Sequence, residues 1–273
     1  MKRVLLTGAA GGIGTLLTPM LKAAYPEVVL SDIKEPADRH GLRFVKADLA
    51  DMAAVREAVA GVDGIVHMGG YSVEGPWETI LSANIAGVHN LFEAARLAGT
   101  KRIVFASSNH AVGFYPRSRK IAHDVTVLPD SRYGVSKAFG EALGAFYAMK
   151  HAMGVTCLRI GNVNATPLDR RRLAIMLHPD DLMQLVRIGL EHPDIVFEVL
   201  YGMSGNTRAW WDNSRAAALG YRPRHDSETN LAAAEAGQAA APADPVGDHY
   251  QGGTFCSAEY TADFEAMKRR EKR

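Results

Sequence analysis

The chain has 273 residues, 47% of them hydrophobic, which is enough for one sizeable core or a core with a small second lobe. Its 31 basic and 30 acidic residues leave a net charge of +1, so the charge favours neither nucleic acid nor an anionic membrane as a partner. Two cysteines, Cys157 and Cys256, are too few for a disulfide framework and fit a reducing compartment. With no signal-peptide pattern and no bilayer-spanning apolar run, we expect a cytoplasmic protein.

Short apolar runs, rich in β-branched residues and bounded by Gly, Asp or Ser, predict β-strands. These runs are Arg3–Thr7, Val28–Ser31, Arg43–Lys46, Gly64–Met68, Arg102–Ser107, Val155–Gly161 and Ile195–Tyr201. Helical patterns between them cover Gly12–Ala24, Asp51–Val59, Trp77–Leu97, Tyr133–Met153 and Asp180–His192. Strands that are apolar throughout suit a parallel sheet covered on both faces, so the alternation predicts an α/β fold with a Rossmann-type doubly wound sheet.

The last quarter of the chain has a different composition. LAAAEAGQAAAPADPVGD, residues 231–248, is rich in Ala, Pro and Asp and predicts an extended surface arm with at most a short helix, or alternatively a disordered tail. QGGTF, residues 251–255, predicts a short strand or turn that returns to the body. MKRREKR, residues 267–273, predicts a solvated, disordered end.

A glycine-rich turn follows the first predicted strand. VLLTGAAGGIG places Gly8, Gly11 and Gly14 at a G-x-x-G-x-x-G spacing where the first helix begins. Glycine lets a pyrophosphate approach the backbone, and the helix N-terminus offers free N–H groups and the positive end of its dipole. A glycine triplet alone is weak evidence, but this one has the required strand-to-helix context. We therefore expect a bound dinucleotide, with Gly12 and Ile13 also in contact.

The second predicted strand ends in an acidic residue, Asp32. A carboxylate there accepts hydrogen bonds from ribose hydroxyls and repels a 2′-phosphate, which favours NAD over NADP. Lys34 and Arg39 lie close by and leave the preference open, and the alternative role of Asp32 is to cap a turn. Further candidate cofactor contacts follow the ends of the strands, namely Ile33, Asp48, Leu49, Met68, Gly69, Gly70, Asn84, Ser107 and Asn162.

RYGVSKAFGEAL places Tyr133 and Lys137 at i and i+4, on one face of a helix. A tyrosine pKa near about 10 makes a poor base at neutral pH, but a nearby ammonium and a nicotinamide cation favour the phenolate. The phenolate can accept a proton from a substrate hydroxyl. The alternative is a surface Tyr and Lys on an amphipathic helix. The preceding glycine loop, acidic strand end and Ser-rich strand end favour the catalytic interpretation.

These segments together resemble the short-chain dehydrogenase/reductase superfamily, in its extended, sugar-modifying form, over residues 1–165. TGAAGGIG and Asp32 stand where that superfamily has its glycine loop and NAD carboxylate, and Ser108, Tyr133 and Lys137 where it has its triad. The resemblance implies that Tyr133 is the base and also contacts the cofactor, that Lys137 tunes it and holds the nicotinamide ribose, and that Ser108 holds the reacting oxygen. Ser107 is the alternative serine.

Further segments are similar to the bacterial uronate dehydrogenases: IVFASSNHAVGFYP, YGVSKAFGE, RIGN, HPDD, WWDNS and QGGTF. Those enzymes oxidise D-galacturonate or D-glucuronate at C1 with NAD to an aldaric acid lactone. The resemblance implies a small sugar acid as the substrate and NAD as the cofactor. Its substrate contacts would be Ser72, Ser108, Asn109, His110, Tyr133 and Arg171.

One residue of the consecutive Arg170, Arg171 and Arg172 is expected to bind the substrate carboxylate. A guanidinium binds a carboxylate bidentately, and a uronate differs from its aldose by that group. Counting back from the HPDD segment selects Arg171, with its two neighbours as alternatives. A solvated basic loop is the non-functional interpretation of the three arginines.

The resemblance is weakest near the substrate. Asn162 stands where the family has Ser, Ala138 where it often has Cys, and NVNATPL and RRRLAIML also differ. These departures leave the particular sugar more open than the reaction. The alternatives are a 1-dehydrogenase of another aldose or modified sugar, a sugar epimerase or dehydratase, and a non-catalytic dinucleotide sensor.

The remaining expectations concern metals and organisation. None of the ten histidines shows metal-ligand spacing, and HPDDL predicts a helix N-terminus, so no metal is expected. Residues 1–165 would form the NAD-binding domain with the catalytic groups. Residues 166–273 would close the substrate site and form an arm on the same domain. The resemblance also implies a homo-oligomer.

Overall fold

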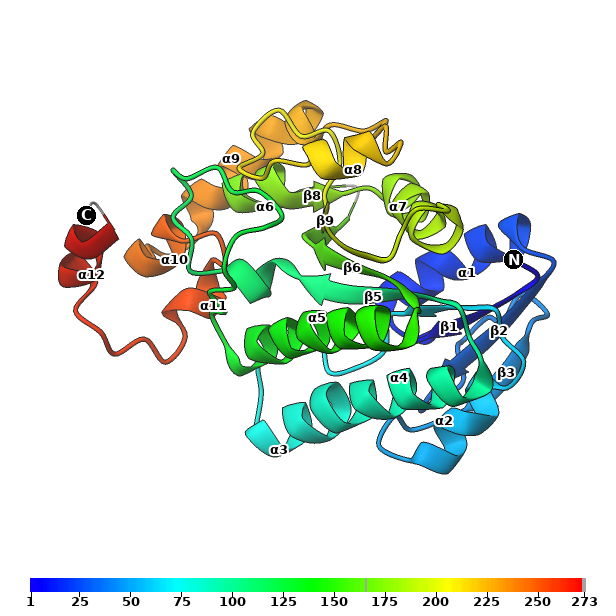
Figure 1. Cartoon of the computed structure of the whole chain (residues 1–273). Helices are drawn as coiled ribbons and strands as arrows, with labels where there is room; N and C mark the ends of the chain where they lie inside the picture. Colours follow the sequence, from blue (N-terminus) through cyan, green and yellow to red (C-terminus); the bar gives the residue numbers. More distant parts are fainter. Residues whose placement is uncertain (165, 272–273) are drawn as a thin grey trace.

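The computed structural model describes residues 1–164 and 166–271 (Figure 1). Within them, a sheet of 7 parallel strands has the order β3-β2-β1-β4-β5-β6-β9. The strands are β1 Arg3–Thr7, β2 Glu27–Asp32, β3 Arg43–Lys46, β4 Gly64–His67, β5 Arg102–Ser108, β6 Gly154–Ile160 and β9 Phe197–Gly202. The order reverses between β1 and β4, so the predicted doubly wound fold is confirmed, and ligands of such sheets bind at the carboxyl ends of the strands beside this reversal.

Helices cover both faces of the sheet (Figure 1). On one face lie α1 and α7, and on the other α2, α4 and α5. Their bounds are α1 Gly12–Ala24, α2 Met52–Val59, α4 Gly87–Ala98, α5 Arg132–His151 and α7 Pro179–Glu191. Successive side chains of a strand point to opposite faces of the sheet, so each strand contributes to two hydrophobic cores. In β1, Val4 and Leu6 pack in the core with α1, and Leu5 packs in the core with α2.

The predicted helix Trp77–Leu97 is divided into three parts. A short α3 (Trp77–Ile80) leads into a π-helical turn, η1 (Leu81–Ala86), before α4 begins. Such turns insert one residue into a helix and often occur at functional sites. Here the turn contains a buried residue, Asn84.

After β6 the chain builds a lobe from short elements. These are β7 Asn162–Val163, α6 Arg170–Ile175, β8 Met176–Leu177, α8 Ser214–Ala218, α9 Leu231–Ala240, α10 Pro245–His249, α11 Thr254–Ser257 and α12 Phe264–Glu271, and the strands β7 and β8 pair with each other. Short 3-10 turns also occur at η2 Asn109–Val112 and η3 Ser227–Asn230. The predicted extended or disordered arm is therefore wrong, because residues 231–248 are largely helical.

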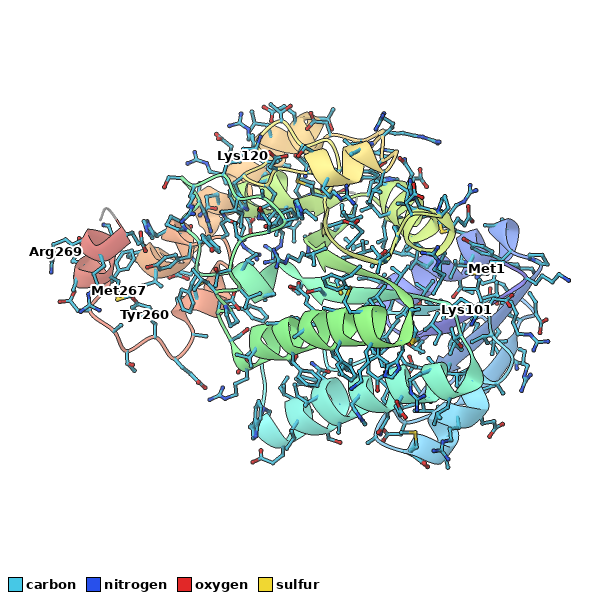
Figure 2. The ribbon with its side chains drawn as sticks, viewed as in Figure 1. Met1, Lys101, Lys120, Tyr260, Met267 and Arg269 are labelled. Atoms are coloured by element: carbon cyan, nitrogen blue, oxygen red, sulfur yellow. The ribbon has the colours of Figure 1, made fainter. Side chains whose placement is uncertain are left out.

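The predicted disorder of the basic end is also wrong for Met267–Glu271, which belongs to α12. Glu271 accepts hydrogen bonds from the Tyr250 hydroxyl at 2.6 Å and from His249 Nε2 at 2.9 Å, and this contact with the end of α10 holds the helix. Residues 272–273 lie outside the described residues. Figure 2 shows Tyr260, Met267 and Arg269 on the end of the molecule that protrudes from the sheet. Residues 251–253 of QGGTF form the predicted turn, and its last two residues begin α11.

No helix in the described ranges is both long enough and apolar enough to cross a membrane.

Candidate active site

The turn between β1 and α1 needs glycine at two positions. Gly8 has φ +69°, and a Cβ atom there would lie 2.5 Å from the carbonyl carbon of Met68. A Cβ on Gly14 would lie 2.1 Å from the carbonyl oxygen of Gly8. At Gly12, a Cβ would meet no atom within 4 Å. The loop therefore packs tightly against the sheet and stays open at the N-terminus of α1, where free N–H groups favour phosphate.

A cavity of about 900 Å³ extends from this turn past the ends of β2, β3 and β4. Its size suits a cofactor. It is lined by a large part of the predicted cofactor set, Gly8, Gly11, Gly12, Ile13, Gly14, Asp32, Ile33, Asp48, Leu49, Met68, Gly69 and Gly70, and by the predicted substrate contact Ser72. The lining also contains residues that the sequence analysis did not select: Thr7, Ala10, Ser31, Lys34, Ala47, Tyr71, Glu78, Thr79, Ser82 and Ala83.

Asp32 supports the loop and also lines the cavity. Its carboxylate accepts hydrogen bonds from the backbone N–H groups of Ala10 at 3.0 Å and Lys34 at 3.3 Å, as the turn-capping alternative expected. An ionised carboxylate has acceptor sites beyond these two. Ribose hydroxyls therefore fit beside Asp32, and the residue types along the cavity fit a dinucleotide.

Farther along the sheet edge, Asn162 offers an unsatisfied acceptor. It lies on β7, and its Oδ1 atom is buried with no hydrogen-bond partner among the described residues. A buried polar atom of this kind usually has a partner. An amide N–H donor, such as a nicotinamide carboxamide, would satisfy it.

The predicted Tyr and Lys lie side by side near the start of α5. Ser131 caps the helix by accepting from the Gly134 N–H at 3.0 Å, and Glu74 accepts from the Tyr133 N–H at 2.9 Å. Lys137 donates to the carbonyl of Ala106, at the end of β5, at 2.8 Å. Its Nζ atom lies 5.4 Å from the centre of the Tyr133 ring. The pair thus shares one buried face that looks onto the carboxyl end of β5.

Burial shifts the pKa values of Tyr133 and Lys137. It raises the pKa of Tyr133 to about 12, although a hydrogen bond with Ser108 lowers it, and it lowers the pKa of Lys137 to about 8. The sequence analysis expected the lysine to lower the tyrosine pKa, but in the protein without cofactor burial raises it. Ser108 is the serine that faces Tyr133, and its Oγ also accepts from the His110 N–H at 3.2 Å.

Arg171 is the inward-pointing residue of the three arginines. Arg170 forms an ion pair with Glu235 and Arg172 with Asp169, whereas none of the described carboxylates pairs with Arg171. Burial and then the nearby Arg117 lower the pKa of Arg171 to about 10, so it is still charged at neutral pH. A half-buried guanidinium without a counter-ion among the described residues is a site for an anionic ligand.

Two groups orient this guanidinium. Arg171 Nε donates to the backbone carbonyl of Gln251 at 2.7 Å. When the Asn109 amide is oriented to satisfy both its atoms, Asn109 accepts from Arg171 Nη2 at 2.8 Å and donates to the carbonyl of Ile160 at 3.1 Å. Asn109 was expected to orient sugar hydroxyls, but its amide is already engaged in holding Arg171.

Known proteins resemble the chain along nearly its whole length. The model of the NAD dependent epimerase/dehydratase family matches residues 4–178. Uronate dehydrogenase of Pseudomonas putida is 47% identical over 259 residues, which cover 94% of this chain and 96% of that protein. The chain belongs to the uronate dehydrogenase family.

Solved structures of this family have the same fold. Glucuronic acid dehydrogenase from Chromohalobacter salexigens matches with a TM-score of 0.89 and 45% identity, covering 94% of this chain and 97% of that one. A variant of uronate dehydrogenase from Agrobacterium tumefaciens, complexed with NAD, matches with a TM-score of 0.88 and 41% identity, with the same coverage of both chains.

Two residues predicted to bind the cofactor have side chains that are already engaged elsewhere in this uronate dehydrogenase-family chain. The Ser107 hydroxyl donates to Glu141 at 2.6 Å, so its hydrogen is not available to the cofactor. The Asn84 amide accepts from the Tyr71 N–H at 2.8 Å and donates to the Tyr71 carbonyl and to Ser136. Asn84 therefore ties the π-helical turn to the loop after β4 and to α5.

The sequence analysis missed three residues that touch the predicted substrate groups. Asp130 pairs with His110 Nδ1 at 2.7 Å, and the Phe255 ring stacks on the His110 ring with centres 3.8 Å apart. Gln251 holds Arg171, as described above. Phe255 and Gln251 lie in QGGTF, whose family resemblance was the available signal, whereas Asp130 has no local pattern that marks it.

One group of potential metal ligands occurs in the described part of this family member. His178, Asp180 and His225 bring ligand atoms within 4.8 Å of one another. The two imidazole rings are stacked, 3.5 Å apart and 16° from parallel. Imidazole binds metals in the plane of its ring, so the rings would have to rotate before both could bind one ion.

Proposed function

We propose that the protein oxidises a cyclic uronic acid, D-galacturonate or D-glucuronate, at C1 to the aldaric acid lactone, with NAD as the oxidant. The observation that carries this proposal is the half-buried, inward-pointing Arg171, charged and without a carboxylate partner among the described residues, on the side of the sheet where Tyr133 and Ser108 lie. Membership of the uronate dehydrogenase family supports the reaction. A guanidinium in this position distinguishes a uronate from its neutral aldose by a bidentate charged contact.

The proposed chemistry needs a proton to leave the C1 hydroxyl oxygen and a hydride to leave C1 itself. Tyr133 takes the proton of the C1 hydroxyl, and Ser108 hydrogen-bonds the same oxygen. Lys137 favours the Tyr133 phenolate and binds a cofactor ribose. Because burial raises the pKa of Tyr133, the base needs a further cation beside it. NAD, when bound, supplies the hydride acceptor and that positive charge.

The proposed cofactor site follows the cavity and the sheet edge beyond it. The backbone of the glycine loop would hold the pyrophosphate, Asp32 the adenosine ribose and Asp48 with Leu49 the adenine edge, and Asn162 the carboxamide. Residues 1–165 would form the NAD-binding domain and 166–273 the portion that closes the substrate site. Ser72, at the end of the cavity, and His110 would contact sugar hydroxyls.

We further propose a cytoplasmic homo-oligomer. Its support is an apolar surface on neighbouring helices, where Val135, Phe146 and Met149 of α5 and Leu97 of α4 are exposed. Both cysteines are free and buried, which suits a reducing compartment. Sedimentation of the purified protein at assay concentrations would reveal the oligomer, and a monomer would contradict this part of the proposal.

A substrate panel tests the reaction. Purified protein is given NAD with galacturonate, glucuronate, galactose or glucose, and NADH is followed by its absorbance. We expect NADH only with a uronate, in stoichiometric amounts. Turnover of a neutral aldose alone would overturn the uronate assignment, and conversion of the sugar without net NADH would indicate an epimerase.

A further inference from the structure

Asp130 is a buried carboxylate at the meeting point of three segments of the substrate site. Its side chain is 0% exposed and pairs with His110 Nδ1 at 2.7 Å. A Cβ atom on Gly113 or Gly252 would lie 1.8 or 1.9 Å from the same Asp130 oxygen, Oδ2. The surrounding backbone therefore encloses this oxygen, which faces the imidazole and also lies 3.8 Å from the Cys256 thiol sulfur.

The second carboxylate oxygen has a fixed donor. Ser131 Oγ accepts from the Gly134 N–H at 3.0 Å as the cap of α5, so its hydrogen is directed to Asp130 Oδ1, 2.7 Å away. With Oδ1 engaged by Ser131, Oδ2 accepts from His110. An ionised aspartate can only accept, so the Nδ1 atom of His110 carries the proton.

The His110 ring is clamped with its other nitrogen available. It stacks on Phe255 at 3.8 Å and meets the edge of Tyr133 at 5.8 Å. Nε2 has no hydrogen-bond partner among the described residues, and 11% of the side chain is exposed. Burial lowers the pKa of His110, although Asp130 raises it, so the ring is neutral at neutral pH and Nε2 is an acceptor.

His110 Nε2 adds an acceptor beside two side chains that offer donors or are already engaged. Arg171 can only donate, and the Asn109 amide is engaged by Arg171 and Ile160. A sugar ring presents hydroxyl groups that each carry one donor hydrogen. A neutral imidazole nitrogen provides a directed acceptor for one of them.

We infer that Asp130 is a positioning residue that holds His110 as the Nδ1–H tautomer, so that Nε2 accepts a hydrogen bond from a substrate hydroxyl. The inference rests on the proposed function for the identity of the substrate. The tautomer itself depends only on the protein. It can therefore be measured whether or not the uronate assignment is correct.

The first test is a nitrogen-15 NMR spectrum of the wild-type protein, with the His110 signals assigned by their loss in His110→Gln. We expect a protonated Nδ1 and an unprotonated Nε2 at neutral pH. Adding galacturonate with NADH, a pair that cannot react, should shift the Nε2 signal. An Nε2–H tautomer or an imidazolium would overturn the inference without any mutation of Asp130. No shift at Nε2 while galacturonate binds would overturn the substrate contact.

Asp130→Asn tests whether Asp130 determines the tautomer of His110. Because Ser131 donates to the oxygen, the new amide turns its NH₂ group toward His110 Nδ1, and the proton moves to Nε2. We expect KM for the uronate to rise by about 10-fold to 100-fold, with a smaller effect on kcat and none on the affinity for NAD. A variant that keeps the wild-type tautomer and KM would overturn the inference.

Asp181→Asn is the matched control. Asp181 is equally buried and accepts from Ser204 and from the backbone N–H groups of Arg224 and His225, at the start of α7. Its replacement should lower stability and leave the His110 tautomer and the uronate KM unchanged. An equal rise in KM for both variants would mean that Asp130 is only structural. Absence of uronate turnover in the wild type would instead overturn the proposed function and leave the tautomer result standing.

Discussion

Tyr133 and Lys137 are both buried, and burial shifts their pKa values in opposite directions. It raises the pKa of Tyr133 to about 12 and lowers the pKa of Lys137 to about 8, so both shifts favour the neutral forms. At neutral pH the protein without cofactor therefore holds Tyr133 as the phenol and Lys137 mostly as the ammonium. Forming the Tyr133 phenolate needs additional positive charge beside the ring.

Tyr133→Phe removes the proposed base and keeps the ring. We expect turnover to fall by about 100-fold to 10,000-fold, the usual contribution of a positioned general base. Binding of NAD, measured by calorimetry, should be largely unchanged, because the substitution removes one hydroxyl and leaves the ring and the dinucleotide cavity in place. Turnover close to that of the wild type would exclude Tyr133 as the base.

Lys137→Met removes a buried ammonium. The pKa of Lys137 in the folded protein, about 8, lies below its value in the unfolded chain. Below about pH 8 the ammonium is therefore protonated in both states and its burial destabilises the fold, and the free energy of unfolding rises with pH between the two pKa values. The variant should therefore be more stable than the wild type at about pH 7, by about 1–3 kcal/mol, and the difference should shrink toward about pH 10. Urea unfolding at both pH values measures this.

The exposed Lys150, on the same helix α5, provides the comparison for this effect. Lys150→Met should show no pH-dependent gain, because its ammonium is solvated in both states. If Lys137→Met is destabilised at neutral pH, the hydrogen bond to the Ala106 carbonyl outweighs the cost of burial.

Arg171→Leu should separate carboxylate recognition from chemistry. We expect KM for the uronate to rise by about 10-fold to 100-fold, the value of a lost charged hydrogen bond, with no loss of NAD binding. Arg170→Leu is the control, since that side chain pairs with Glu235 on the surface. Equal effects of the two substitutions would contradict the assignment of the inward arginine.

At the scale of elements, the sequence predicts the bounds of a strand or helix correctly where a local residue pattern determines them. The strands β1 and β3 and the helix α1 have the predicted bounds, because each pattern stops at a local signal: Gly8 after β1, Asp48 shortly after β3 and Pro26 shortly after α1. The lobe after β6 could not be predicted in this way. The helix α12 contains no buried residue, and contacts of Glu271 with His249 and Tyr250 hold it in place.

The same distinction applies to the candidate site. Gly8, Asp32, Tyr133 and Lys137 have spacings that a sequence displays. The contact of Asp130 with His110 spans twenty residues and depends on how the loop after η2 returns to α5, so no local pattern indicates it. Gln251 and Trp211 are likewise brought together only by the folded lobe.

Trp211→Phe tests whether the lobe holds Arg171 in place through Gln251. Trp211 Nε1 donates to the side chain of Gln251 at 2.8 Å, and the carbonyl of Gln251 holds Arg171. Loss of the donor leaves a buried acceptor unpaired, and we expect a destabilisation of about 1–3 kcal/mol in thermal unfolding together with a raised uronate KM. Trp210→Phe is the control, because its Nε1 is buried with no partner among the described residues. A greater loss in the control would contradict this role of Trp211.

At the scale of the whole molecule, one edge of the sheet collects the site from distant parts of the chain. The glycine loop, the ends of β4 and β5, the start of α5 and the turn at Gln251 all converge there, because parallel strands end on the same side. A ligand that fills this edge contacts both cores and the lobe. Its binding energy therefore adds to the stability of the entire fold.

This coupling makes cofactor preference visible in thermal unfolding. NAD at about 100 times its dissociation constant adds about 2.7 kcal/mol to the free energy of unfolding, which raises Tm by about 5 °C or more. NADP at the same concentration should raise it less, because its 2′-phosphate meets the carboxylate of Asp32. Asp32→Asn removes the negative charge and should reduce the difference between the Tm shifts that NAD and NADP produce. Equal shifts with both dinucleotides in the wild type would show that Asp32 serves only to support the loop through Ala10.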